Sequence, residues 1–203
     1  MYSAKFFIRD VNDISCDPCS ISATQSSLKL KSVFYFKIEF IRCKEENNLT
    51  TTLHIRPAKL TDVDLIFEWS NDQLVREQSF HSDVISYAPH CEWFKNKLTD
   101  KTALIYIVEA DGKPASMLRI DVKTNNAVIG VVIGKEFRGK GLGSISISKG
   151  VTEYFKANGL PILASVKKQN IASIKAFKKA GFSYLRDEKI NQIDSVVYQM
   201  IKA

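Results

Sequence analysis

The sequence has no long hydrophobic run and no recognisable signal segment. Its most apolar stretch, residues 33–41, already contains Lys37 and Glu39, whereas a membrane-spanning helix needs about 18 or more consecutive apolar residues. Arg9 and Asp10 interrupt the N-terminal apolar residues, which excludes the pattern of a secretory signal peptide. These absences predict a cytoplasmic protein that is not integral to a membrane.

Cysteine is also scarce, with four residues among 203, at positions 16, 19, 43 and 91. They are too few and too scattered for the disulfide framework of a secreted domain. Cys16 and Cys19 form a Cys-x-x-Cys pair, but no second pair at zinc-site spacing follows, and Pro18 between them is typical of a turn. We therefore interpret the pair as a loop, with metal or redox use as the minor alternative, and expect no metal.

The composition is that of an ordinary globular protein. Hydrophobic residues make up 45% and charged residues 25% of the sequence, which excludes general disorder, collagen and coiled coil. The net charge is +7, and ten cations lie between Lys135 and Lys179. Such a segment suits nucleic acid, an anionic surface or a phosphate-rich small molecule. Nucleic acid is disfavoured because the segment lacks the aromatic interleaving that stacks bases, and its charges flank a glycine-rich turn.

A polar stretch at residues 43–52 separates two apolar patterns and predicts a boundary. Residues 1–50 would be an N-terminal extension and residues 51–203 the main domain. Within the extension, apolar and polar residues alternate from Leu28 to Phe40, which indicates a strand with one buried face. We expect this extension to be dispensable for chemistry and to be a candidate surface for homodimer formation or for solubility.

The main domain alternates strands and helices without internal repeats. Strands are predicted at 53–56, 103–109, 115–121, 127–133, 162–166, 182–185 and 195–201. Helices are predicted after an N-cap at Thr61, at 89–98, around 147–155 and at 170–179. Asp111-Gly112 predicts a tight hairpin turn, and the almost wholly apolar strand 127–133 is expected at the centre of a sheet.

The most informative segment, residues 131–143, reads Val-Val-Ile-Gly-Lys-Glu-Phe-Arg-Gly-Lys-Gly-Leu-Gly. Glycines let backbone N–H groups converge on an anion, and a helix N-terminus adds free donors and partial positive charge. The spacing matches neither a P-loop nor a dinucleotide fingerprint. A pyrophosphate site is favoured over a strand-to-helix turn that merely needs flexible residues.

Arg138-x-x-Gly141-x-Gly143 after an apolar strand resembles the signature of the GNAT superfamily of N-acetyltransferases, in which this loop holds the acetyl-CoA pyrophosphate. Asn170-x-x-Ser173-x-x-x-Phe177 followed by Gly181-Phe182 is similar to the second motif of that superfamily. The resemblance covers residues 53–201. It implies an α/β fold with a mixed, largely antiparallel central sheet flanked by helices, and acetyl-CoA as the acetyl donor.

The resemblance also implies a cofactor site. Its strand would splay from the next one and expose backbone groups to the pantetheine arm. Asn170 would bind the same arm, with an N-cap role as the alternative, and Lys175, Lys178 and Lys179 would meet the 3′-phosphate or form a solvated face. The implied cofactor residues are Val132, Ile133, Arg138, Gly139, Lys140, Gly141, Leu142, Gly143, Ser144, Asn170 and Lys179.

The catalytic groups are harder to assign. Relatives place a Tyr acid where this chain has Phe177, and a Glu near the start of the central strand where this chain has Val128. The remaining candidates for acid and base are Tyr184, Tyr198, Glu92 and His90. The expected oxyanion donor is the backbone N–H around Val132.

The acceptor is suggested by residues 67–94, whose Trp-x-Asn-Asp, Val-Arg, Ser-Phe, Ile-Ser and His-x-x-Trp patterns resemble acetyltransferases of the pseudaminic acid pathway. Those enzymes acetylate the 4-amino group of a UDP-linked 4-amino-4,6-dideoxy sugar, so the small-molecule partners would be acetyl-CoA and such a UDP-amino sugar. Predicted acceptor residues are Trp69, Asn71, Arg76, His90 and Trp93. Alternatively, Trp69 and Trp93 simply pack two amphipathic helices into the core.

Two other functions stay open. Ribosomal-protein N-terminal acetyltransferases share part of the Trp-x-Asn pattern, which leaves a protein N-terminus or another small amine as acceptor. Phe177 and Val128 also leave open a domain that binds acyl-CoA without turnover.

Overall fold

The computed structural model describes residues 51–202. The predicted strand at 28–40 and the Cys16–Cys19 pair lie outside the described residues. The elements are β1 (Leu53–Pro57), the 3-10 turn η1 (Leu60–Asp62), α1 (Val63–Asn71), α2 (Gln73–Gln78), α3 (Tyr87–Thr99), β2 (Ala103–Ala110), β3 (Lys113–Val122), β4 (Ala127–Ile133), the 3-10 turn η2 (Lys135–Phe137), α4 (Leu142–Ala157), β5 (Ile162–Lys167), α5 (Ile171–Lys179), β6 (Ser183–Ile190) and β7 (Ile193–Met200).

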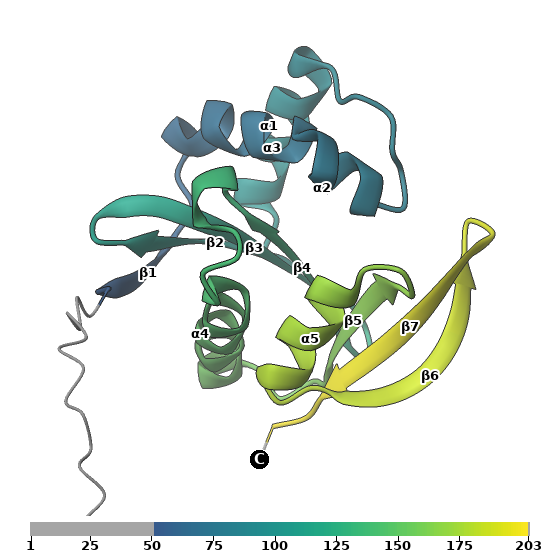
Figure 1. Cartoon of the computed structure of the whole chain (residues 1–203). Coiled ribbons are helices and arrows are strands. Elements are labelled where there is room, and N and C mark those ends of the chain that lie inside the picture. The colour runs from purple at the N-terminus through teal and green to yellow at the C-terminus, as the bar shows by residue number, and fades with distance from the viewer. Residues whose placement is uncertain (1–50, 203) are drawn as a thin grey trace, which may run out of the picture. The chain divides into compact units, whose positions relative to one another are not determined.

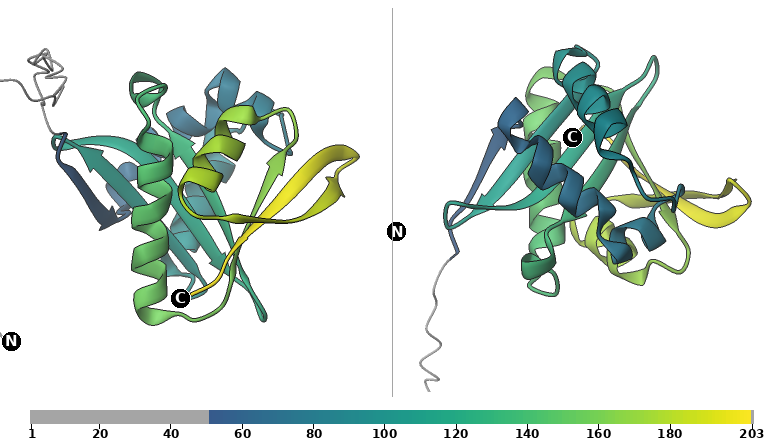
Figure 2. Two further views of the ribbon diagram at one scale, coloured as in Figure 1. Left: turned by 60° about the horizontal axis from the view of Figure 1, so that its bottom comes forward. Right: turned by 90° about the horizontal axis from the view of Figure 1, so that it is seen from above.

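The strands of the described domain form one seven-stranded sheet in the order β1-β2-β3-β4-β5-β7-β6. Only β4 and β5 run parallel, and the other neighbours are antiparallel. Helices α4 and α5 cover one face, and α1, α2 and α3 lie on the other (Figures 1 and 2). The predicted mixed, largely antiparallel sheet flanked by helices is confirmed, with β4 at its centre.

Each face of the sheet carries its own core. Under α4 and α5, alternate residues of β3 and β4 such as Leu118, Ile120 and Ile129 meet Ile147 and Tyr154. A Cβ on Gly150 would stand 2.9 Å from Leu118 Cδ2, so α4 approaches β3 closely because residue 150 has no side chain. On the other face, the second core contains Ile66, Trp69, Phe94, Ile105, Ile107 and Met117.

The predicted elements are all present, with one further helix and with corrections to the start of the first helix and to the length of the last hairpin. The first helix is not capped by Thr61, because Asp62 is its N-cap and no side chain makes a capping hydrogen bond to α1. Helix α2 was not predicted. The last hairpin is longer than predicted, since β6 and β7 extend to a turn at Asn191 and Gln192, which have φ of 50° and 64°.

The predicted turn between β2 and β3 is confirmed. Asp111 and Gly112 both have positive φ, 50° and 77°, as a two-residue hairpin turn of the favoured twist requires. This hairpin fixes the pairing of β2 with β3 and thereby the position of β4 beside them.

The two parallel strands separate soon after they meet. Strand β4 pairs with β3 along its whole length, and β5 pairs with β7 along its whole length. Between β4 and β5, only Ala127 and Val128 have partners, Ile162 and Leu163. The sheet therefore opens at residues 129–133, in agreement with the splay implied by the resemblance.

Candidate active site

A cavity of about 1460 Å³ lies where β4 and β5 separate. Its lining comes from the α2–α3 region, β3, β4, the glycine turn before α4, β5 and α5. All the predicted cofactor residues except Lys140 line it, as do three predicted acceptor residues, Arg76, His90 and Trp93. The fold thus brings together two groups of residues that are far apart in the sequence.

The glycine turn between η2 and α4 suits a pyrophosphate. Gly139 and Gly141 have φ of 74° and 75°, a left-handed conformation that favours glycine. A Cβ on either would meet no protein atom within 4 Å, so a ligand can approach the backbone there. Gly141 is the N-cap of α4, which has no side-chain cap, and its first N–H groups lack intrahelical acceptors. These features fit the diphosphate of acetyl-CoA.

Other residues of this turn have structural roles. Gly143 lies inside α4, and a Cβ there would stand 3.5 Å from the Cβ of Ala176, an ordinary van der Waals contact where α4 packs on α5. The Nζ of Lys140 lies 5.6 Å from the centre of the Phe137 ring and away from the cavity lining. Lys140 is therefore the predicted cofactor residue that the cavity lining does not include.

Arg138 is held by protein groups. Its Nε donates to the carbonyl of Ile133 at 3.0 Å, and its Nη1 lies 2.8 Å from Oδ1 of Asp72, the N-cap of α2. Burial tends to raise the pKa of Asp72, but the hydrogen bond and charge of Arg138 lower this pKa overall. Arg138 thus fixes the glycine turn to the end of β4 and to α2.

The register of β4 decides which backbone N–H groups face the opening. The N–H of Gly134 donates to β3, and that of Ala127 donates toward the β5 side. Because successive residues of a strand alternate in direction, Val132 directs its N–H into the β3 ladder. The N–H groups of Val131 and Ile133 face the gap, and neither has an acceptor within residues 51–202. Among the backbone N–H groups around Val132, those that a ligand in the gap could reach are therefore the N–H groups of Val131 and Ile133.

Helix α5 contributes the opposite wall. Asn170 lines the cavity and also caps α5, since its Oδ1 accepts the N–H of residue 173 at 3.0 Å. The N-cap role is thus present, and Nδ2 stays available to a ligand. Lys175 and Lys179 line the cavity, whereas Lys178 Nζ lies 5.9 Å from the centre of the Tyr198 ring.

Trp69 and Asn71 do not line the cavity, and both make contacts that hold the elements around it. Trp69 is buried in the second core, and its indole lies 3.2 Å from where a Cβ on Gly134 would stand. Asn71 donates to the carbonyl of Ile85 at 3.0 Å and accepts its N–H at 2.8 Å. Trp69 follows the core-packing alternative, and Asn71 ties α1 to the segment before α3.

Arg76 lines the cavity, but its terminal nitrogens hold the loop after α2. Nη1 donates to the carbonyls of His81 and Asp83 at 3.1 and 3.3 Å, and Nη2 donates to the Ser79 hydroxyl at 3.0 Å. Burial lowers the pKa of Arg76. Its Nε is buried and has no partner among the described residues. Arg76 therefore holds α2 and the loop after it, which form the part of the lining that we call the roof of the cavity.

His90 is buried against Phe94, with the two rings stacked at 6.1 Å between centres. Its Nε2 lies 3.0 Å from the carbonyl oxygen of Val63. A carbonyl can only accept a hydrogen bond, so in the neutral ring Nε2 carries the proton and Nδ1 keeps a lone pair. His90 thus lines the cavity, and Nδ1 is its ring nitrogen that can accept a proton.

The other candidate acids and bases lie elsewhere. Tyr184 is 59% exposed on β6 and donates to Asp187 at 3.3 Å, Glu92 is exposed on α3, and Tyr198 is buried in the first core. None of the three lines the cavity, whereas Phe177 and Val128 do. Among the described residues, the lining contains no tyrosine.

Two cationic residues of the lining were not predicted as site residues from the sequence, Arg119 on β3 and Lys167 on β5. Lys167 is buried and its Nζ donates to the carbonyl of Glu77 at 2.7 Å. Together with the Asp72–Arg138 pair, this contact places α2 across the mouth of the splayed strands. No sequence signal singled them out, because β3 also contains Ser116 and Asp121 and β5 also contains Ser165.

The charges of the cavity are of one sign. Six cationic side chains line it, and within residues 51–202 no aspartate or glutamate does; the six are Arg76, Arg119, Arg138, Lys167, Lys175 and Lys179. Buried Lys167 adds to a positive potential in a partly enclosed space, where charges are poorly screened.

The sequence matches the family model described as acetyltransferase (GNAT) domain over residues 52–183. No significant match to a curated protein sequence was found. Among solved structures, the fold is similar to spermidine N-acetyltransferase from Vibrio cholerae in complex with CoA and spermine (TM-score 0.67, 16% identity, 73% of this chain and 95% of that chain). It is also similar to aminoglycoside acetyltransferase AAC(6')-Ib in complex with coenzyme A (TM-score 0.65, 18% identity, 74% of this chain and 95% of that chain). A third similar structure is YncA, a putative acetyltransferase from Salmonella typhimurium, with acetyl-CoA (TM-score 0.62, 18% identity, 73% of this chain and 93% of that chain).

The chain therefore belongs to the GNAT acetyltransferase family, as the glycine turn and the splayed strands indicate. It is an acetyl-CoA-dependent N-acetyltransferase. Over residues 51–202, no helix has the length and apolarity to cross a membrane, and no group of three or more His, Cys, Asp or Glu side chains is placed to hold a metal ion.

Proposed function

We propose that the chain acetylates the primary amine of a small anionic acceptor, and specifically the 4-amino group of a UDP-linked 4-amino-4,6-dideoxy sugar. The observation that carries this proposal is the cavity, with six cations and no carboxylate in its described lining. The named acceptors of two structural neighbours, spermine and the aminoglycosides, are polycations. Three of these cations, Arg76, Arg119 and Lys167, lie outside the part of the cavity assigned to acetyl-CoA, and their charge favours a diphosphate over a polycation.

The donor half of the site is suited to acetyl-CoA. The glycine turn and the start of α4 would take the diphosphate, and Lys175 and Lys179 would take the 3′-phosphate. Asn170 Nδ2 would contact the pantetheine arm along the free edge of β4. When bound, acetyl-CoA supplies the acetyl group as a thioester. The N–H groups of Val131 and Ile133 face the gap and are the donors available to the carbonyl oxygen of that thioester.

The same positive potential assists the chemistry of the amine. Only the neutral amine is a nucleophile, and nearby cations lower the pKa of an ammonium group because they disfavour its charged form. His90 Nδ1, with its lone pair free, would accept the proton that the amine loses. Positive charge also stabilises the departing thiolate, so a site with Phe177 in place of a tyrosine acid remains functional.

The experiment is an acceptor panel. Purified protein is incubated with acetyl-CoA and, separately, a UDP-4-amino-4,6-dideoxy sugar, a peptide with a free N-terminus, and spermidine, and acetylated product is measured by mass spectrometry. We expect the UDP-amino sugar to be acetylated. We also expect it to inhibit the acetylation of any weaker acceptor when the two are mixed. Efficient acetylation of peptides, with no reaction or competition by the UDP-amino sugar, would contradict the proposal and favour a protein N-terminal acetyltransferase. Binding of acetyl-CoA without transfer to any of these amines would favour a non-catalytic domain.

A further inference from the structure

Counting partners within residues 51–202, Arg119 is the acceptor-side cation whose terminal nitrogens remain unpaired. We propose that this guanidinium binds a phosphate group of the acceptor and thereby selects which amines enter the site. The inference rests on the proposed function, because it concerns the acceptor half of the same cavity.

The position of Arg119 leaves room for a ligand beside it. Arg119 and Met117 are alternate residues of β3 and line the cavity, on the face of the sheet that α1 and α3 cover. Directly across the ladder, Arg119 faces Gly130 of β4. A Cβ on Gly130 would meet no atom within 4 Å, so the sheet surface next to the guanidinium is open.

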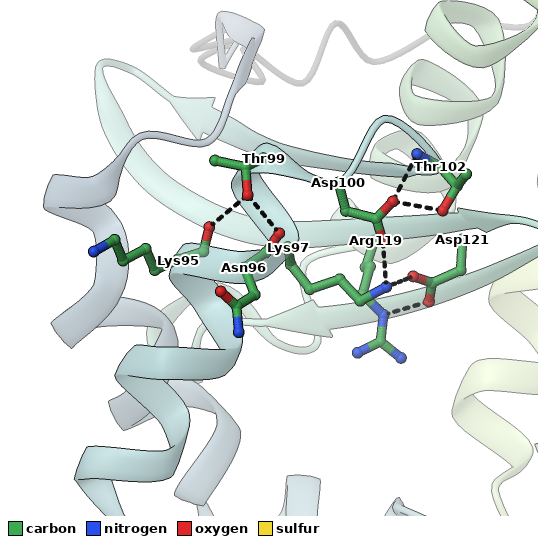
Figure 3. Close-up of polar contacts among 8 residues, drawn as sticks. All are labelled: Lys95, Asn96, Lys97, Thr99, Asp100, Thr102, Arg119 and Asp121. Atoms are coloured by element: carbon green, nitrogen blue, oxygen red, sulfur yellow. Dashed lines mark hydrogen bonds and ion pairs between the residues drawn. The ribbon is translucent and has the colours of Figure 1, made fainter.

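Two neighbours, Asp121 and Trp93, contact the guanidinium of Arg119. Its Nε lies 2.8 Å from Oδ2 of Asp121, and its Cζ lies 5.5 Å from the centre of the Trp93 ring, a cation–π distance. Figure 3 shows the two terminal nitrogens extending away from Asp121. Within residues 51–202, neither has a hydrogen-bond or ion-pair partner. Trp93, one of the predicted acceptor residues, thus supports Arg119.

A second layer fixes Asp121. Lys97 Nζ lies 3.0 Å from Asp121 Oδ1 and 3.0 Å from Asp100 Oδ2, and the hydroxyl of Thr102 donates to Asp100 at 2.6 Å (Figure 3). Neither carboxylate lines the cavity. The network therefore orients the fork of Arg119 without placing negative charge where the acceptor binds.

The other cations on this side are already engaged. Lys167 donates to the carbonyl of Glu77, and Arg76 holds the loop after α2. A guanidinium with two free, coplanar nitrogens matches two oxygens of a phosphate, a geometry that an ammonium group lacks. These contacts assign the phosphate-binding role to Arg119.

The test measures anion binding, independently of turnover. Calorimetry with UDP and with inorganic pyrophosphate is run at saturating CoA, so that the cofactor's own phosphate site is filled. We expect Arg119→Met to weaken UDP binding by about 10- to 100-fold, and Arg119→Lys to weaken it less. Pyrophosphate should follow the same order, because the contact is to phosphate. Asp121→Asn should give an intermediate loss, since it removes the partner that orients the fork.

Arg186→Met is the matched control, because Arg186 lies on β6 outside the cavity lining and forms an exposed pair with Glu188 at 3.0 Å. It should leave UDP binding unchanged, and all variants should bind acetyl-CoA within twofold of wild type. Wild-type protein that binds neither anion, or an Arg119→Met variant that binds UDP within twofold of wild type, would overturn the inference. Failure of the proposed function would instead appear as no acetylated UDP-amino sugar, even with Arg119-dependent UDP binding.

Discussion

Asp72 and Arg138 form an ion pair that joins α2 to the turn before α4, with 2.8 Å between Oδ1 and Nη1. Asp72 also accepts the N–H of Val75 at 3.3 Å, and Arg138 Nε donates to the carbonyl of Ile133. Two side chains thus connect the roof of the cavity, the free end of β4 and the glycine turn.

Asp72→Asn keeps an acceptor for the N-cap but removes the charge that pairs with Arg138. We expect a destabilisation of roughly 1–2 kcal/mol, because a partly buried guanidinium loses its partner. Urea unfolding checks this. Glu153→Gln, which breaks the more exposed pair with Lys156, is the control and should change the free energy of unfolding little. Equal effects of both substitutions would show that the Asp72–Arg138 contact adds nothing special.

The stability of the domain should fall in acid. Burial tends to raise the pKa of Asp62, but hydrogen bonds from Arg56 and from the backbone of Lys59 lower it overall. Hydrogen bonds from Thr102 lower the pKa of Asp100 to about 2. A carboxyl with a depressed folded-state pKa stabilises the fold above its unfolded pKa, near 4, and this stabilisation is lost as the pH falls through the folded-state value.

We therefore expect stability to decline between about pH 4 and pH 2, measured as the free energy of unfolding in urea at each pH. Asp62→Asn and Asp100→Asn should each lower stability at neutral pH and flatten the acid decline. A variant that keeps the wild-type slope would show that its carboxyl does not titrate with folding.

Gly141→Val should weaken acetyl-CoA binding at least about tenfold, or about 1.4 kcal/mol. Its Cβ would project into the open space of the cavity, and its φ of 75° is unfavourable for valine. Gly112→Val is a matched control, because Gly112 has a φ of 77° with open space around it but lies in the β2–β3 turn. Calorimetry that finds equal acetyl-CoA affinities for the two variants would contradict the pyrophosphate assignment.

A chain that starts at Thr51 should bind acetyl-CoA and keep the rate constants for transfer, because the family match begins at residue 52 and every cavity residue follows it. Steady-state kinetics of the full and shortened chains check this. A folded, monodisperse short chain that does not bind acetyl-CoA would place the domain boundary before residue 51.

Sequence patterns were sufficient where a short segment carries its own geometry. The turn at Asp111-Gly112 and the run from Val131 to Gly143 could be predicted because their glycines and apolar residues act locally. The register between paired strands, and the face of the sheet on which each side chain lies, were not predictable from such local patterns. Lys167 and Lys168 are neighbours in sequence, yet Lys167 is buried at the cavity while Lys168 is exposed and pairs with Asp187 at 2.7 Å.

Because register and facing could not be predicted, the sequence did not identify which backbone N–H faces the gap or that Arg119 lines the acceptor side. Val132 differs from Val131 and Ile133 only by the direction of its N–H, which is set by pairing with β3. The proposed role of Arg119 depends on its contacts with Asp121 and Trp93, of which Trp93 lies on a different element. Such residues are found only once the strands and helices are placed.

The most direct test of the central claim compares kcat/KM for two acceptors that carry the same amine, a UDP-linked 4-amino-4,6-dideoxy sugar and the same amino sugar without its nucleotide. The account predicts a preference of at least about 100-fold for the UDP-linked form, or about 2.7 kcal/mol of transition-state binding, because the cationic cavity holds the diphosphate. Equal values for the two sugars, or a higher kcat/KM for spermidine than for either, would contradict it.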